Sequence, residues 1–220
     1  MKVLVACEES QAVCKAFREK GHEAYSCDII ECSGGRPEWH IQDDVLPLLN
    51  GNCGFFTMNG KYHKIKGKWD LIIAHPPCTY LSNCGAARLY PKKGQLNPER
   101  YAKGLEAKEF FMRFYNADCD RIVIENPIPT KVYQLPPYTQ IIQPYEHGHP
   151  YSKKTCLWLK GVPALKPTNV ITENITSWVS GGSKDHRGNP RENKGTVYRD
   201  SLTRSKTFPG IAKAMAEQWG

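Results

Sequence analysis

The chain has 220 residues, a length typical of one domain with at most a small appendage. Apolar residues make up 40% and aromatic residues 10% of the sequence, which excludes a disordered chain. No apolar run approaches the roughly 18 residues of a membrane span, and the first ten residues lack the pattern of a signal peptide. The nine cysteines show no CxxC pair, so we expect reduced thiols in the cytoplasm and no metal site.

Positive charge is concentrated in one part of the sequence. The chain carries 30 Lys and Arg against 22 Asp and Glu, a net charge of +8. Residues 147–206 hold 11 basic and 4 acidic side chains, or +7, so nearly all the excess lies there. Segregated positive charge indicates a polyanionic partner, because neutralising phosphates releases counterions. A solvated basic surface that aids solubility is the alternative.

The N-terminal part predicts two strands joined by a helix. Residues 1–6 are apolar and β-branched, which is typical of a buried strand, and the polar turn CEES follows. Ser10 is expected to cap the next helix and Gly21 to end it. Residues 23–27 predict a second strand with Asp28 at its carboxyl end.

The rest of the chain continues the alternation of strands and helices. Asp43 and Asp44 precede a small apolar patch. The further predicted elements are a hairpin or loop at 50–68, strands at 69–74, 121–124 and 155–159, helices at 98–117 and 208–219, and a long loop at 168–206.

Alternating strands and helices predict an α/β, Rossmann-like fold with a mostly parallel sheet and helices on both faces. In such sheets ligands bind beyond the carboxyl ends of the strands. The candidate functional segments all stand at predicted strand ends: CEES, Asp28, Asp44, His75-Pro76-Pro77-Cys78 and Glu125-Asn126-Pro127.

Two of these segments carry reactive groups. Cys78 follows two prolines, which stiffen the turn and hold the thiol at a defined place over the sheet edge. A thiolate is a strong nucleophile, and a carboxyl group such as that of Glu125 can donate a proton or hydrogen-bond a base edge. If their strands are neighbours, the two side chains share one crevice.

The segment Pro76-Pro77-Cys78-Thr79-Tyr80-Leu81-Ser82 resembles the PPCQxFS nucleophile motif of DNA cytosine-5 methyltransferases. Glu125-Asn126-Pro127 is similar to the ENV motif of that family, in the same order along the chain. Residues 150–155 (PYSKKT) stand where the family has PQxRxR, and residues 209–211 lie near its final motif. The pattern spans most of the chain and also resembles small phage-encoded methyltransferases, which implies a bacterial or phage-infected host cell.

The resemblance implies S-adenosyl-L-methionine as methyl donor and C5 of cytosine in DNA as acceptor, through a covalent Cys–C6 intermediate. The implied catalytic residues are Cys78, Glu125 and Lys153. The implied cofactor-binding residues are Ala6, Cys7, Glu8, Ser10, Asp28, Asp44 and Pro76. The implied substrate-binding residues are Pro77, Ser82, Asn126 and Lys154.

The resemblance also implies a division of the chain into a catalytic domain at 1–167, a reduced basic recognition segment at 168–206 and a C-terminal helix at 207–220 that packs back on the catalytic domain. We expect DNA as partner, no membrane, and a monomer in preference to an oligomer. The first loop has Glu8 and Glu9 where the family has a glycine pair, Thr79 replaces its Gln, and Thr155 its second Arg.

Two other functions stay open at this point. An amino-group methyltransferase acting on N4 of cytosine or N6 of adenine needs an aromatic residue after the two prolines, where this chain has Cys78. A catalytically weak or inactive nucleic-acid-binding relative is favoured by the glycine-poor first loop and the short recognition segment.

Overall fold

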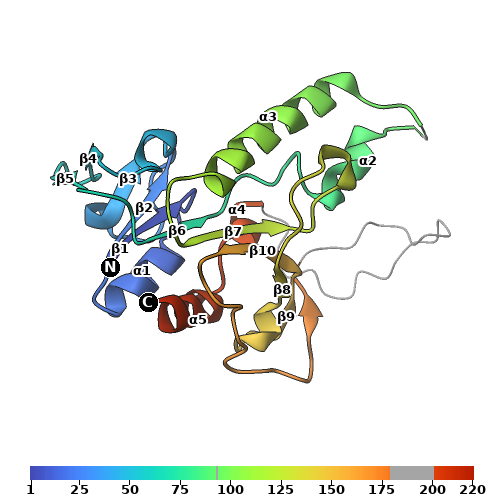
Figure 1. Cartoon of the computed structure of the whole chain (residues 1–220). Coiled ribbons are helices and arrows are strands. Elements are labelled where there is room, and N and C mark those ends of the chain that lie inside the picture. Colours follow the sequence, from blue (N-terminus) through green and yellow to red (C-terminus); the bar gives the residue numbers. More distant parts are fainter. Residues whose placement is uncertain (93, 179–200) are drawn as a thin grey trace.

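A central sheet of seven strands organises the computed structural model, which describes residues 1–92, 94–178 and 201–220. The strands lie in the order β3-β2-β1-β6-β7-β10-β8 (Figure 1). Their bounds are β1 Lys2–Ala6, β2 Glu23–Asp28, β3 His40–Gln42, β6 Leu71–Ala74, β7 Ile122–Pro127, β8 Gln140–Ile142 and β10 Thr155–Lys160.

The direction of the strands confirms the predicted fold class. Strands β3, β2, β1, β6 and β7 pair in parallel, and β10 runs antiparallel to both β7 and β8. The chain leaves β1 toward β2 and β3 on one side and returns to β6 and β7 on the other, so the strand order reverses between β1 and β6. This is a Rossmann-like α/β fold with one reversed strand, and its topological switch point lies between β1 and β6.

Helices and two small sheets complete the described chain. The helices are α1 Ala12–Glu19, α2 Ala86–Leu89, α3 Pro98–Tyr115, α4 Ser201–Ser205 and α5 Pro209–Trp219. The small sheets pair β4 Gly54–Phe56 with β5 Tyr62–Lys64, and β9 Tyr151–Ser152 with β11 Thr176–Ser177. The expected helices near 98–117 and 208–219 and the hairpin within 50–68 are therefore confirmed.

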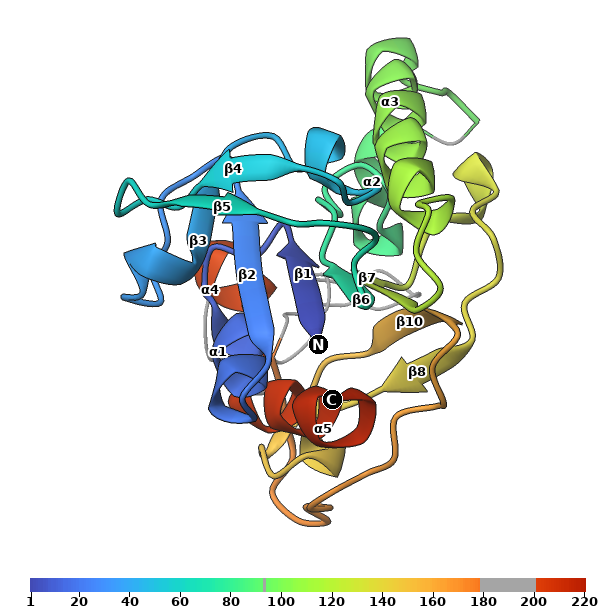
Figure 2. The same ribbon diagram turned by 60° about the vertical axis from the view of Figure 1, so that its left-hand side comes forward.

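Alternation along the central strands builds one hydrophobic core on each face of the sheet. Val3 and Val5 of β1 face the layer formed by α1 and α5, whereas Leu4 faces the layer formed by α3 and the β4–β5 hairpin. Figure 2 shows α1 and α5 together on one side of the sheet and α3 on the other. Both faces are thus covered, as a mostly parallel sheet requires.

Two predicted boundaries were wrong. Strand β7 does not stop before Glu125 but continues to Pro127, because antiparallel β10 pairs Leu157 with Glu125 and Thr155 with Pro127. Helix α1 is not capped by Ser10, whose Oγ lies 3.5 Å from the amide of Ala12. The carboxylate of Glu8 instead accepts hydrogen bonds from the first-turn amides.

The predicted recognition segment at 168–206 lies partly outside the described residues. Its first part packs on the body of the molecule, because β11 pairs with β9 and the ring of Trp178 lies 4.7 Å from those of Tyr151 and Phe208. Its last part was expected to be loop but contains helix α4. None of the helices in the described ranges combines the length and the apolar character needed to cross a bilayer.

We predict that Trp219→Ala destabilises the protein by about 3–5 kcal/mol, the usual loss for a buried Trp. The Trp219 side chain is fully buried against the α1 side of the sheet, and its indole donates to the carbonyl of Pro163 at 3.0 Å. Urea unfolding followed by circular dichroism measures the change. Lys213→Ala, an exposed change on the same helix, is the control, and equal stabilities of the two variants would contradict the packing described.

Candidate active site

The carboxyl ends of β1, β2, β6 and β7 meet at one edge of the sheet. The register pairs Ala6 with Cys27 on one side and with Ala74 on the other, and Ala74 pairs with Ile124. The residues that follow these positions therefore line a common edge across the switch point. The sequence placed its candidate segments there, and the topology brings them together as expected.

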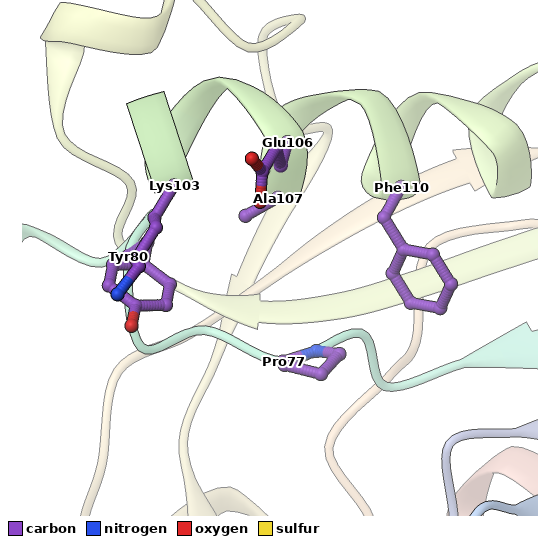
Figure 3. Close-up of a pocket in the computed structure, with 6 residues that line it drawn as sticks. All are labelled: Pro77, Tyr80, Lys103, Glu106, Ala107 and Phe110. Carbon is purple, nitrogen blue, oxygen red and sulfur yellow. The ribbon is translucent and has the colours of Figure 1, made fainter. Parts of the chain in front are cut away.

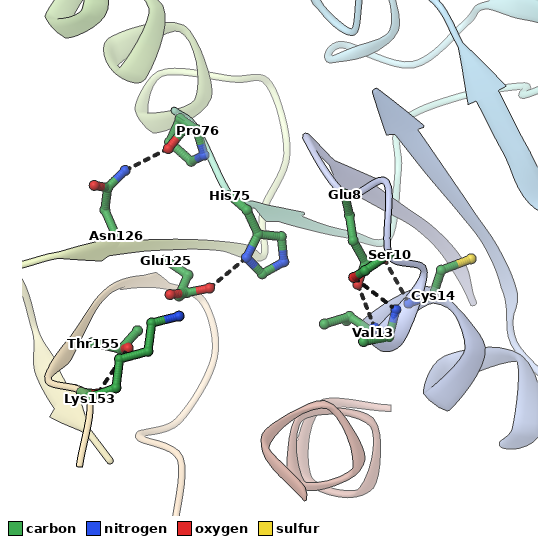
Figure 4. A network of polar contacts seen from close by, with 11 residues as sticks. Glu8, Ser10, Val13, Cys14, His75, Pro76, Glu125, Asn126, Lys153 and Thr155 are labelled. Atoms are coloured by element: carbon green, nitrogen blue, oxygen red, sulfur yellow. Dashed lines mark hydrogen bonds and ion pairs between the residues drawn. The ribbon is translucent and has the colours of Figure 1, made fainter. Parts of the chain in front are cut away.

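A buried ion pair joins β6 to β7 at this edge. His75 Nδ1 lies 2.7 Å from Glu125 Oε2, and the two side chains are only 12% and 11% exposed (Figure 4). Burial alone would lower the pKa of His75, but the hydrogen bond and the charge of Glu125 outweigh it and the pKa is raised. Burial conversely raises the pKa of Glu125, but His75 and Lys153 outweigh it and the pKa is lowered. Both pKa shifts favour the charged forms, an imidazolium and a carboxylate.

Cys78 sits in the turn that follows the two prolines. Its carbonyl accepts the amides of Leu81 at 3.2 Å and Ser82 at 2.9 Å, which closes the turn. Burial is the main cause that raises the pKa of the half-buried thiol, the charge of Glu125 adds to it, and the charge of Lys153 opposes it. The three predicted catalytic side chains thus lie close enough to influence one another.

Lys153 reaches this cluster from the far side of the sheet edge, between β9 and β10. Its amide donates to Gln143 Oε1 at 2.9 Å, and its ammonium group extends toward Glu125 (Figure 4). The neighbouring Lys154 is exposed. Lys153 therefore lies near the buried carboxylate of Glu125, whereas Lys154 faces solvent.

The remaining predicted substrate-binding residues hold the Pro-Pro turn. Asn126 is 2% exposed and its Nδ2 donates to the carbonyl of the buried Pro76 at 2.8 Å. Ser82 is 8% exposed and bridges to Pro129. Pro77, in contrast, is exposed at the surface of the turn.

The loop after β1 is built without glycine at its strained positions. Cys7, which follows the fully buried Ala6, and Gln11 have left-handed backbones with φ of 57° and 58°, a conformation that costs a non-glycine residue about 1–2 kcal/mol. Glu8 is 4% exposed and accepts the amides of Val13 at 2.6 Å and Cys14 at 3.1 Å. A side-chain carboxylate thus occupies the N-terminus of α1, where it also faces His75.

Burial raises the pKa of Glu8 to about 7, although the charge of His75 and the two amides oppose the rise. The carboxyl group of Glu8 therefore titrates near neutral pH. Across the switch point it faces His75, whose other partner is Glu125, so the loop after β1 and strand β7 are electrostatically coupled through His75.

The two predicted acidic cofactor residues differ in their surroundings. Asp28 is half-buried at the end of β2, its Oδ1 accepts the amide of Ile30 at 3.3 Å, and burial raises its pKa. Asp44 is exposed and its Oδ1 accepts the amide of Leu46 at 3.0 Å. Burial is the main cause that raises the pKa of Cys7, and the charges of Asp28 and Asp44 add to the rise. The three residues therefore border the same part of the sheet edge.

Sequence reasoning did not assign a role to His75 or to the segment before α5. His75 is the polar residue between a buried strand and a Pro-Pro turn, a position that marks it as a site candidate. Thr207 hydrogen-bonds Glu125, and Lys206 contacts Glu9 Oε1 at 3.6 Å and Ser33 Oγ at 2.9 Å. No sequence signal connects Thr207 with Glu125, because 82 positions separate them and only the fold brings them together.

We predict that Glu125→Gln lowers the pKa of His75, because the hydrogen bond and the charge of Glu125 are lost and only the charge of Glu8 still opposes the effect of burial. NMR titration of the imidazole measures both values, and His147, which lies outside the pair, is the internal control. The pair stabilises the fold most between pH 4.5 and pH 6.5. The raised pKa of His75 gives its full stabilisation below pH 6.5, and the lowered pKa of Glu125 gives its stabilisation above pH 4.5. An unchanged His75 titration would contradict the assignment of the pair.

Comparison with known proteins finds similarity in structure but not in sequence. No family model and no curated protein matches this chain. Among the solved structures that match are a protein described as a DNA modification methyltransferase encoded within an E. coli prophage (12% identity, TM-score 0.43), the Entamoeba histolytica methyltransferase EhMeth (12%, 0.39) and a mutant of Spodoptera frugiperda DNMT2 (15%, 0.36). Each alignment covers 78% of this chain and 52%, 57% and 54% of the respective other chain. The chain thus spans about half the length of these structures.

Proposed function

We propose that this chain transfers a methyl group from S-adenosylmethionine to C5 of cytosine in DNA, with Cys78 as nucleophile. The observation that carries the proposal is the meeting of Cys78, Glu125 and Lys153 at one edge of the sheet. The three residues come from motifs that lie far apart in the sequence. The chemistry of DNA cytosine-5 methyltransferases needs a thiol, a carboxyl group and a cation around one ring.

On the base side, the Cys78 thiolate adds to C6 of cytosine, which makes C5 electron-rich enough to accept a methyl group. Because the pKa of Cys78 is raised, the resting group is the thiol and must lose its proton to a water molecule as C6 is attacked. The charge of Lys153 opposes the rise in pKa and stabilises the thiolate as it forms.

Glu125 acts on N3 of the same ring, and His75 is its positioning residue. The imidazolium donates to Oε2 of Glu125 and so fixes the orientation of the carboxylate. A proton that passes from Nδ1 of His75 to Glu125 and on to N3 makes C6 more electrophilic and leaves a neutral imidazole. When the ring recovers its aromaticity, a water molecule takes the proton from C5, the bond between C6 and the Cys78 sulfur breaks to release the thiolate, and the proton on N3 returns along the same path.

The loops after β1 and β2 suit the proposed donor. Asp28 offers a half-buried carboxylate for ribose hydroxyls at the end of β2. His75 Nε2 is buried and has no hydrogen-bond partner among the described residues, so it can meet a polar group of a ligand beside Glu8. S-adenosylmethionine, when bound, supplies an electrophilic methyl group on a sulfonium.

The proposed DNA contacts come from the basic stretch at 147–206, which includes Lys154. Reaching a cytosine inside a duplex requires flipping it out, which costs a few kcal/mol that pocket and backbone contacts must offset. The short segment available for recognition favours a short target sequence.

The test is incubation with labelled S-adenosylmethionine and DNA, followed by nucleoside mass spectrometry. We expect label in 5-methyldeoxycytidine, none with Cys78→Ser, and full activity with the exposed control Cys84→Ser. Label in an N4- or N6-methylated nucleoside that survives Cys78→Ser would instead establish an amino-group methyltransferase. Binding of DNA without any transfer would establish an inactive relative.

We further predict that His75→Asn lowers the single-turnover rate by about 100-fold or more, the contribution of a general acid. Asn retains a donor near the position of Nδ1 but cannot pass on a proton, so the rate should also lose its dependence on pH near neutrality. DNA affinity, measured by anisotropy, should stay unchanged. A variant with the wild-type rate and pH profile would reduce His75 to a structural partner of Glu125.

A further inference from the structure

A cavity of about 430 Å³ lies between the turn that carries Cys78 and helix α3. Figure 3 shows its lining from both elements: Pro77, Tyr80, Lys103, Glu106, Ala107 and Phe110. Its volume is in the range of small-ligand sites. Nothing in the chemistry described above uses this cavity, although Pro77 is the residue directly before the proposed nucleophile.

The wall formed by Tyr80 is held in place by α3. Arg100 Nη2 donates to the carbonyl of Thr79 at 2.8 Å, and its guanidinium carbon lies 4.9 Å from the centre of the Tyr80 ring. A Cβ on Gly85 would come within 2.8 Å of Arg100 Nη2 and 3.1 Å of the Thr79 carbonyl, so this contact depends on glycine there. The ring is therefore positioned before any ligand arrives.

The lining combines ring surface with one carboxylate. Tyr80 and Phe110 offer aromatic faces, and Ala107 leaves room between them. Lys103 is paired with Glu99 at 2.9 Å, one turn back on the helix. Glu106 adds a carboxylate that can accept a hydrogen bond from an amino group.

The surrounding chain is positively charged, which identifies the kind of ligand. The described residues 86–92 and 94–108 carry five Lys or Arg and two Glu, a net charge of +3. A polyanion that presents flat rings matches both the charge and the aromatic walls, and a DNA strand is such a polyanion.

We propose that this cavity binds the unstacked nucleobase next to the target cytosine, with Tyr80 and Phe110 against its faces and Glu106 accepting from an exocyclic amino group. The identity of the strand rests on the proposed function. Adenine, cytosine and guanine carry such an amino group and thymine does not, so the cavity selects against thymine at this position. Part of the sequence specificity then comes from α3.

The first test places 2-aminopurine at each position that flanks the target in a duplex oligonucleotide. At one position the probe should be brighter when bound to Tyr80→Ala than when bound to wild type, because the ring no longer stacks on it. Tyr80→Ala should also weaken DNA binding by about 5- to 100-fold, the effect of losing one stacked base. Tyr80→Phe should behave as wild type, and so should Tyr115→Ala, which changes an exposed tyrosine at the end of α3.

The second test compares substrates with adenine, cytosine or thymine beside the target. Glu106→Gln should reduce the preference against thymine by about tenfold, whereas Glu109→Gln, three residues along the helix, should not change it.

The inference is overturned if Tyr80→Ala binds DNA and 2-aminopurine as wild type does, or if Tyr115→Ala shows the same loss. If the wild type transfers methyl groups and the Tyr80 and Glu106 variants keep its DNA binding and its preference against thymine, this site is refuted and the proposed function is not. Tyr80-dependent stacking without methyl transfer would uphold the site and refute the proposed function. A wild type that does not bind DNA refutes both.

Discussion

The parallel pairing of β6 with β7 is the constraint on which the rest of the site depends. Because Ala74 pairs with Ile124, the next residue on each strand emerges at the same height, and His75 meets Glu125 at 2.7 Å. The prolines after His75 then turn the chain back over the edge, which brings Cys78 under the influence of the same carboxylate. A shift of one residue in this register would turn Glu125 to the opposite face of the sheet and separate the group.

Charges alternate across the switch point, and this arrangement offsets the cost of burying them. Glu8, His75, Glu125 and Lys153 form a sequence of opposite signs from the end of β1 to the end of β9, with the neutral Thr207 also bonded to Glu125. An isolated buried charge would cost several kcal/mol, so removing one member leaves its neighbours poorly compensated. A change of charge in the loop after β1 therefore alters the electrostatic environment of Glu125. This coupling links the proposed cofactor-binding loop to the proposed base-binding residues.

The sequence predicted most of the sheet edge because an apolar run indicates a buried strand. The polar residues that follow such a run indicate where the strand ends. It predicted Cys78 and Glu125 as site residues from their flanking motifs, and the order of the strands places both at the same edge of the sheet. It missed the extent of β7, since that depends on pairing with β10, and it missed the cap by Glu8, since a carboxylate five residues before Val13 reaches α1 only through two left-handed backbones. The contacts of Thr207 and the cavity beside α3 are tertiary, so no local pattern encodes them.

The central claim is that the Cys78 sulfur and the Glu125 carboxyl group face one pyrimidine ring. Trapping the protein on DNA that contains 5-fluorocytosine, digesting the complex with trypsin and sequencing the cross-linked peptide by mass spectrometry tests this claim most directly. The account predicts a covalent bond from Cys78 to the fluorinated base, and loss of the cross-link in Glu125→Ala with DNA still bound. A bond to another cysteine, or undiminished trapping without the carboxyl group, would contradict it.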